Sequence, residues 1–144
     1  MKELLVEFIS LALQCKLLML PILKDLLRLR LNNSNGLTLN QVTEIYNFFR
    51  FENGKVFNNG TNYLHILNID PLSSTGGIQN YNSNRYVVGK LRRNTQSGQI
   101  YDFPVGTNLL YQLATIDFSS ATLTGFALDA SFSTTIGGTP PQLD

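Results

Sequence analysis

Three side chains beyond residue 32 have the chemistry of general acids and bases. His65 is the only histidine of the chain, and Glu44 and Glu52 are carboxylates that folding could bring together. Two carboxylates flanking a glycosidic bond can hydrolyse it, and a histidine exchanges protons near neutral pH. No G-x-S-x-G, P-loop, H-E-x-x-H or EF-hand pattern accompanies them. We therefore expect no catalytic residue and no enzymatic activity, with His65 on the outer face of a strand or bonded to one backbone group.

Residues that hold metals and cofactors are sparse. Cys15 is the only cysteine, which excludes an intrachain disulfide and a cysteine-based metal site. With one cysteine and one histidine, a zinc site of the usual type is also excluded. The acidic residues after residue 32 lack the short spacing of a calcium loop; they are Glu44, Glu52, Asp70, Asp102, Asp117, Asp129 and Asp144. We expect no metal and no cofactor.

The charge of the chain points away from nucleic acid. The formal net charge is +1 and charged residues make up 15% of the sequence, below the quarter that is usual in soluble domains. Lys90, Arg92 and Arg93 form a small basic cluster, which we interpret as a solvated strand end because three charges do not make a binding stripe. Hydrophobic residues reach 43%, which argues against disorder.

The first thirty-one residues differ from the rest of the chain. They hold twelve leucines and five of the eleven basic residues. Their spacing predicts a helix over residues 3–20, ended by Pro21, and a second short helix over residues 22–31. Lys16 interrupts the apolar run, which excludes a membrane span. A secretion signal, an amphipathic helix packed on the β part or on a partner, and a misassigned start stay open, as does membrane contact by this leader.

Residues 32–94 read as short β coils after an Asn-rich boundary at 32–36. Strands are predicted at residues 37–39, 45–51, 55–57, 63–67 and 85–93. Asn53-Gly54 and Asn59-Gly60 mark tight turns, and Gly89 permits a bulge or a close backbone approach. Fourteen asparagines between Asn32 and Asn94 suit stacked, solenoid-like coils whose asparagines pair with one another. A meander or sandwich stays open.

Residues 95–144 show cleaner alternation, which predicts a partial β-sandwich. Three sets of side chains each share a face: Tyr101, Phe103 and Val105; Ala114, Ile116 and Phe118; and Phe126, Leu128, Ala130 and Phe132. Residues 137–141 look like a linker. A fragment of a longer protein is an open alternative, because a truncated sandwich would leave an unpaired sheet edge.

Three segments carry a family resemblance: residues 86–93 (YVVGKLRR), 101–107 (YDFPVGT) and 111–114 (YQLA). They resemble the β-rich modules of large secreted or cell-surface, adhesin-like proteins of Bacteroidetes associated with type IX secretion. The similarity covers roughly residues 36–141, and residues 51–56 are similar to the upstream coils. It implies a structural motif made of Gly89, Arg92, Arg93, Phe103, Pro104, Val105, Gly106 and Tyr111.

The physics of the second segment is independent of that resemblance. Pro104 fixes its own φ and favours an extended Phe103, and Gly106 can adopt a positive φ. We therefore expect a turn at residues 103–106, anchored in the core by Phe103 and Val105.

The fold class expected is mainly β, with an N-terminal helical leader and solenoid-like coils that lead into a small sandwich.

The leading functional hypothesis is a non-catalytic structural or adhesive module, extracellular or at the cell surface, with glycans or other surface proteins as partners and no nucleic acid. A carbohydrate-binding module and a viral capsid or spike protein are the alternatives. Aromatics that could stack on sugars, or simply pack in the core, are Tyr46, Phe48, Phe49, Phe51, Tyr63, Tyr81 and Tyr86.

Overall fold

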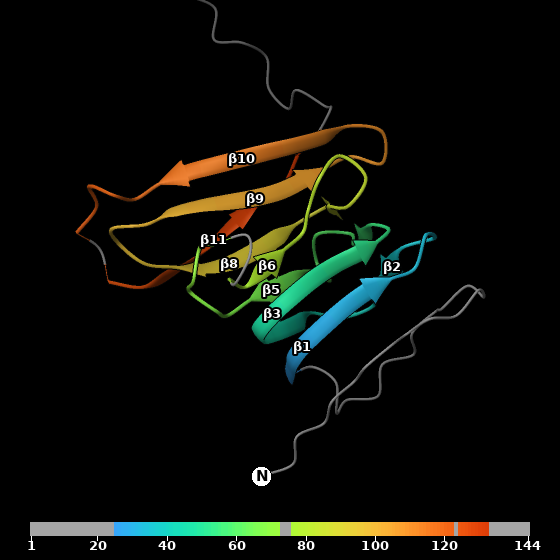
Figure 1. The fold of residues 1–144 in the computed structure, drawn as a ribbon, viewed down its shortest axis with the longest axis horizontal. Coiled ribbons are helices and arrows are strands. Elements are labelled where there is room, and N and C mark those ends of the chain that lie inside the picture. Colours follow the sequence, from blue (N-terminus) through green and yellow to red (C-terminus); the bar gives the residue numbers. More distant parts are fainter. Residues whose placement is uncertain (1–24, 73–75, 123, 133–144) are drawn as a thin grey trace, which may run out of the picture.

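The computed structural model describes residues 25–72, 76–122 and 124–132, which form two β-sheets around one hydrophobic core (Figure 1). Sheet A contains β1 (Asp25–Asn32), β3 (Thr43–Asn53), β5 (Leu64–Ile66), β6 (Ile78–Gln79), β8 (Leu91–Thr95) and β11 (Phe126–Ala130). Sheet B contains β2 (Leu37–Thr38), β4 (Val56–Phe57), β7 (Val87–Val88), β9 (Ile100–Gly106) and β10 (Tyr111–Asp117). The prediction of a mainly β chain is confirmed, and within these residues no helix is suited to crossing a membrane.

Most strand pairs of both sheets are parallel. In sheet A, β3 lies between β1 and β5, and β8 pairs with the other side of β5. In sheet B, the order β2-β4-β7-β9 is parallel throughout. The chain therefore reaches β8 by repeatedly leaving one sheet, entering the other and returning in the same direction. Side chains of one type stack in register as a result, as Val56, Val87 and Val105 do in sheet B.

Tight corners connect the two sheets. Gly54 and Gly60 adopt φ of 85° and 83°, as expected of the two Asn-Gly pairs. The strands on either side of Gly54 are β3 in sheet A and β4 in sheet B. This pair is therefore a corner between sheets rather than a hairpin turn.

The last two strands reverse direction. β10 pairs antiparallel with β9, and β11 pairs antiparallel with β8. The predicted inward faces are confirmed: Tyr101, Phe103 and Val105 are buried. Six residues of the other two sets pack partly buried against the core, namely Ala114, Ile116, Phe118, Leu128, Ala130 and Phe132, and the Phe126 ring packs on Phe118 with centroids 4.9 Å apart. Each sheet thus ends in a strand whose inner side chains extend the core.

The predicted helix over residues 22–31 is wrong from Asp25 onward, because these residues form β1. Leu29 and Leu31 are buried while Arg28 and Arg30 are exposed, which is the two-residue period of a half-buried strand. The alternation of Leu and Arg outweighs the helix propensity of both residue types. The predicted helix over residues 3–20, Pro21 and the linker-like residues 137–141 lie outside the described residues.

The single strand predicted over residues 85–93 is wrong, because it is divided between the sheets. β7 lies in sheet B and β8 in sheet A, and Gly89 forms the corner with φ of 119°. A Cβ on Gly89 would lie 2.5 Å from Asn58 Oδ1. The expected close backbone approach at Gly89 is therefore present, at a corner instead of within a strand.

Both expected domain boundaries fall on elements of sheet A. The boundary at residue 32 coincides with the last residue of β1, which pairs with β3. The boundary between residues 94 and 95 falls inside β8. Residues 95–132 add strands to both sheets that residues 25–94 begin.

Candidate functional site

The candidate acid–base residues lie on the outer face of sheet A. His65 is placed opposite Glu44 of β3 and Arg92 of β8 by the parallel register. Its Nδ1 lies 3.2 Å from Glu44 Oε1 and its Nε2 lies 3.0 Å from Asn94 Oδ1. His65 thus faces outward as expected, but its partners are two side chains instead of a backbone group. Both ring nitrogens are occupied, which favours a structural role across three strands.

Glu44 and Glu52 do not form a carboxylate pair. Both lie on β3, and eight residues of extended strand span about 26 Å. Glycosidases need their two carboxyl groups within about 10 Å of each other. Glu52 Oε1 lies 2.7 Å from Arg50 Nε on the same strand. The structure therefore offers no glycosidase geometry from these two residues.

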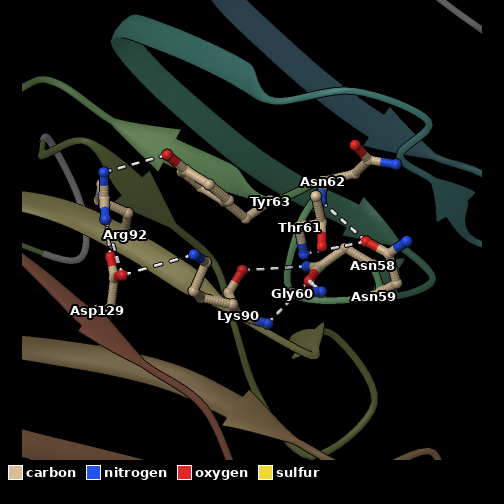
Figure 2. A network of polar contacts seen from close by, with 9 residues as sticks. All are labelled: Asn58, Asn59, Gly60, Thr61, Asn62, Tyr63, Lys90, Arg92 and Asp129. Atoms are coloured by element: carbon tan, nitrogen blue, oxygen red, sulfur yellow. Dashed lines mark hydrogen bonds and ion pairs between the residues drawn. The ribbon is translucent and has the colours of Figure 1, made fainter.

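A connected polar cluster joins the corner of residues 58–63 to β8 and β11 (Figure 2). Asn58 donates from Nδ2 to the Lys90 carbonyl at 3.0 Å and accepts from the Lys90 N–H at 2.8 Å. Its Oδ1 also accepts from the Gly60 N–H at 3.1 Å. Asn59 Oδ1 accepts from the N–H groups of Thr61 and Asn62. Side-chain amides thus replace backbone partners at a corner where strand pairing stops.

Two cations contact the Tyr63 ring in the same cluster. Lys90 Nζ lies 3.8 Å and Arg92 Cζ 4.9 Å from the ring centroid, and Arg92 Nη1 donates to the Tyr63 hydroxyl at 3.1 Å. Cation–π contacts of this kind contribute about 0.5–1 kcal/mol at exposed sites. The two basic side chains are therefore held in place by an aromatic ring.

Asp129 of β11 joins the same two cations (Figure 2). Its oxygens accept from Arg92 Nε at 2.5 Å and Arg92 Nη2 at 2.8 Å, and Lys90 Nζ lies 3.5 Å away. The hydrogen bonds from Arg92 lower the pKa of the Asp129 carboxyl, and the same bonds raise the pKa of Arg92. The bidentate pair ties β11 to β8, and the network of two cations and one carboxylate keeps a net charge of +1.

Arg93 corrects the interpretation of the basic cluster as a solvated strand end. It is fully buried, on the inner face of β8. Its guanidinium donates to the carbonyls of Asp102 at 2.6 Å and Asp70 at 3.3 Å. It lies 5.2 Å from the Tyr101 ring and 5.9 Å from the Phe103 ring. Burial lowers its pKa, and its Nε has no hydrogen-bond partner.

The residues 103–106 do not form the expected turn. Phe103, Pro104, Val105 and Gly106 continue β9, and the chain reverses at residues 107–110, where the Thr107 N–H donates to the Leu110 carbonyl at 2.9 Å. Pro104 has no N–H group, but no hydrogen bond to β7 is lost there, because β7 pairs only with Val105 and Gly106 of β9. Phe103 and Val105 are buried as predicted.

Gly106 is required for space rather than for a positive φ. A Cβ there would collide with the Leu110 carbonyl and with the Tyr86 ring. Tyr111 begins β10, and its ring packs on Tyr86 with centroids 5.3 Å apart. The motif of the second and third segments therefore shapes the β9–β10 hairpin.

One surface depression of about 420 Å³ lies beside the buried arginine. It is lined by Asn68, Ile69, Asp70, Pro71, Leu72, Gln96 and Gln99. Its polar residues are amides and one carboxylate, and the depression contains none of Glu44, Glu52 and His65. Arg93 donates to the Asp70 carbonyl, and the Tyr101 hydroxyl donates to the Ile69 carbonyl. These two bonds hold the loop that lines the depression.

The candidate sugar-stacking aromatics are mostly structural. Phe49, Phe51 and Tyr86 are buried in the core. The Tyr81 hydroxyl donates to Asp102 Oδ2 at 2.6 Å, and burial together with this bond raises its pKa. Phe48 lies under the Arg28 guanidinium, and Tyr63 under Lys90. Tyr46, with 48% of its surface exposed, is the most accessible of the set.

Sequence reasoning missed the partners of the polar network. Asp129 appeared as one of several scattered acids, and Asn58 as one of many turn asparagines. Their sequence separations from Arg92 and Lys90 are 37 and 32 residues, so no local pattern connects them. The available signal was Asp129 at an outward position of an alternating strand. Among the described residues, no three side chains of the His, Cys, Asp and Glu types gather in a way that could hold a metal ion.

Comparison of the chain with protein-family models, with characterised proteins and with solved structures finds no match.

Replacing Asn58 with Ala is expected to lower the free energy of unfolding by about 2–3 kcal/mol, because the Lys90 N–H and carbonyl lose their partners in a partly buried corner. The measurement is urea unfolding followed by circular dichroism. Asn84→Ala is the matched control, since Asn84 is exposed, and we expect a change within about 0.5 kcal/mol. Equal effects of the two substitutions would contradict the role assigned to Asn58.

Replacing Asp129 with Asn is expected to lower the stability at pH 7 by about 0.5–1 kcal/mol, because solvent screens a network whose carboxylate is more than a third exposed. The folded-state pKa of Asp129 is lowered below the ordinary value of 3.8. Its contribution is therefore present above that value and is lost as the pH falls through the lower folded pKa. Urea unfolding of both proteins from pH 7 to pH 2 should show the difference shrinking below about pH 4. A difference that stays constant at pH 2 would contradict this account.

Proposed function

We propose that this chain is a structural and adhesive β module of a bacterial cell-surface or secreted protein, and that it is not an enzyme. In this proposal the parallel strands form short solenoid-like coils that lead into a small sandwich. The observation that carries it is the in-register parallel stacking in both sheets, which runs from β1 to β8 and from β2 to β9. Repeated coils that each cover their neighbour give a stiff, elongated body.

The state of the polar side chains supports a mechanical role. His65, Asp129 and Asp102, which would be candidates for chemistry, each bridge different strands or loops instead. Thr115 Oγ1 and the Tyr81 hydroxyl both donate to the Asp102 carboxylate, and so fasten β10 and the segment after β6 to β9. Polar contacts of this kind resist sliding between layers, which is useful in a stalk or joint. They also occupy these three side chains, so that none of the three is prepared to act on a substrate.

The uncharged polar surface fits exposure outside the cell. With 15% charged residues and a net charge of +1, the molecule has little electrostatic attraction for nucleic acid.

Antibodies raised against residues 25–132 should label intact cells that express the native gene. The control is a cytosolic protein, which is labelled only after permeabilisation. Labelling of this chain that also required permeabilisation would contradict the proposed location.

Carbohydrate binding is the second candidate, and the exposure of Tyr46 favours it. Tyr46 lies on β3 next to Glu44 and presents an aromatic ring on the outer face of sheet A. Such a ring stacks on the apolar face of a sugar, while neighbouring polar groups bind its hydroxyls.

If sheet A binds a glycan, Tyr46→Ala is expected to weaken binding by about tenfold, which corresponds to one stacking contact. Screening the full chain on a glycan array and titrating any ligand by calorimetry supply the measurement. Leu109→Ala is the control, since Leu109 is exposed but aliphatic. Absence of saturable binding to any array glycan would exclude this second function.

A further inference from the structure

The strands at the sheet edges differ in how they are protected from pairing with another chain. An edge strand leaves a row of N–H and C=O groups unpaired, and proteins protect such edges with charges or by keeping the strand short. β1 carries the exposed Arg28 and Arg30, and β11 carries Asp129 at an outward position. β2 has only two residues. β6, which pairs only with β3, also has two residues. These four edges among the described residues are therefore protected.

β10 is the edge without these devices. It has seven residues and no proline, and its only charged residue is Asp117 at its end. Its Leu113 is 46% exposed, and in the adjoining turn Leu110 is 49% and Leu109 is 89% exposed. In the part of the chain that the structure describes, β9 is the only strand paired with it. This edge combines available backbone groups with exposed apolar side chains.

The hydrogen-bond pattern identifies which backbone groups are available. The Phe118 N–H donates to the Gln99 carbonyl, and the Leu110 carbonyl accepts from the Thr107 N–H. Because antiparallel strands bond at alternate residues, the even-numbered residues of β10 are directed toward β9. The odd-numbered residues Tyr111, Leu113, Thr115 and Asp117 direct their N–H and C=O groups to the open edge.

We propose that β10 pairs antiparallel with β10 of a second copy of this chain, around a two-fold axis at Ala114. In this register Leu113 of one copy lies opposite Thr115 of the other, and Tyr111 lies opposite Asp117. Odd-numbered residues meet odd-numbered residues, so the open donors and acceptors satisfy one another. The only charge of the strand faces a tyrosine, and no like charges meet.

The side chains on the outer face favour the same arrangement. Leu113 and Thr115 share that face, since the Thr115 hydroxyl reaches the outward carboxylate of Asp102. Diagonal neighbours in an antiparallel pair lie about 7–8 Å apart, which long side chains can bridge. The two Leu113 side chains are diagonal neighbours in this register and would cover each other across the axis. A two-fold contact of this kind closes on itself and forms a dimer rather than a filament.

The test combines sedimentation equilibrium with residue-resolved amide exchange measured by NMR on the full chain. We expect a reversible monomer–dimer equilibrium. The amides of Tyr111, Leu113, Thr115 and Asp117 should become protected as the protein concentration rises, whereas those of Ala114 and Ile116 should be protected at every concentration. Leu113→Lys should weaken self-association by at least about tenfold, because two lysines then meet near the axis.

Leu109→Lys is the matched control, since Leu109 is more exposed than Leu113 but lies outside β10. Dimerisation of this variant should be unchanged. Unaltered thermal unfolding of both variants confirms that they fold. A monomer at millimolar concentration would overturn the proposal. So would odd-numbered amides protected equally at all concentrations, which would mean that the chain's own residues cover the edge, or a dimer that Leu113→Lys leaves intact.

Discussion

The in-register parallel pairing of successive strands is the constraint on which the other features of the molecule depend. Thr43, Leu64 and Leu91 occupy one inward row of sheet A, and Val56, Val87 and Val105 occupy one row of sheet B. A row of this kind forms only if each passage between the sheets returns the chain to the same height. The corners must therefore be tight, which explains why residues with positive φ occur at Gly36, Gly54, Gly60 and Gly89. Short strands follow from the same requirement.

Tight corners interrupt the backbone ladder, and asparagine side chains satisfy the groups that are left over. Asn58 bonds to Lys90, Asn68 Nδ2 to the Asn47 carbonyl at 2.8 Å, and Asn80 Nδ2 to the Phe51 carbonyl at 2.6 Å. A buried backbone group without a partner costs about 1–3 kcal/mol. The asparagines, which we expected to pair with one another, bond to backbone groups instead. These three reach a neighbouring layer, whereas Asn33, Asn59 and Asn82 bond within their own turns. Asn suits this work because it donates, accepts and tolerates the left-handed region, as Asn80 does with φ of 59°.

Local patterns in the sequence predicted those parts of the fold that depend on alternation within one strand. The strands around Ile45, Val56 and Leu64 and the inward faces of β9, β10 and β11 are confirmed. The pattern failed where two short strands follow each other through a corner, since residues 85–93 alternate continuously although β7 and β8 belong to different sheets. The prediction for β1 failed for a different reason: the high helix propensity of leucine and arginine was preferred to their two-residue alternation, whereas the pairing with β3 decides the structure. The polar network could not be predicted, because its residues meet only through the register of distant strands.

The same register explains why Arg93 is buried, although burying a guanidinium by itself destabilises the fold. In sheet A, Arg93 continues the inward row of Ile45 and Ile66. A shift of β8 by one residue would turn the guanidinium outward to water and recover its hydration, since side chains alternate between faces.

Three contacts oppose such a shift: the two bonds between Asn58 and the Lys90 backbone, and the bidentate pair of Arg92 with Asp129. A shift would break all of them and would force Arg92 inward, away from its carboxylate. The outer network therefore fixes the register that the core arginine by itself would not select. Once Arg93 is held inside, its guanidinium binds the carbonyls of Asp70 and of Asp102 in β9. It thereby fastens the loop at Asp70 to β9 and gives both carbonyls a hydrogen-bond partner.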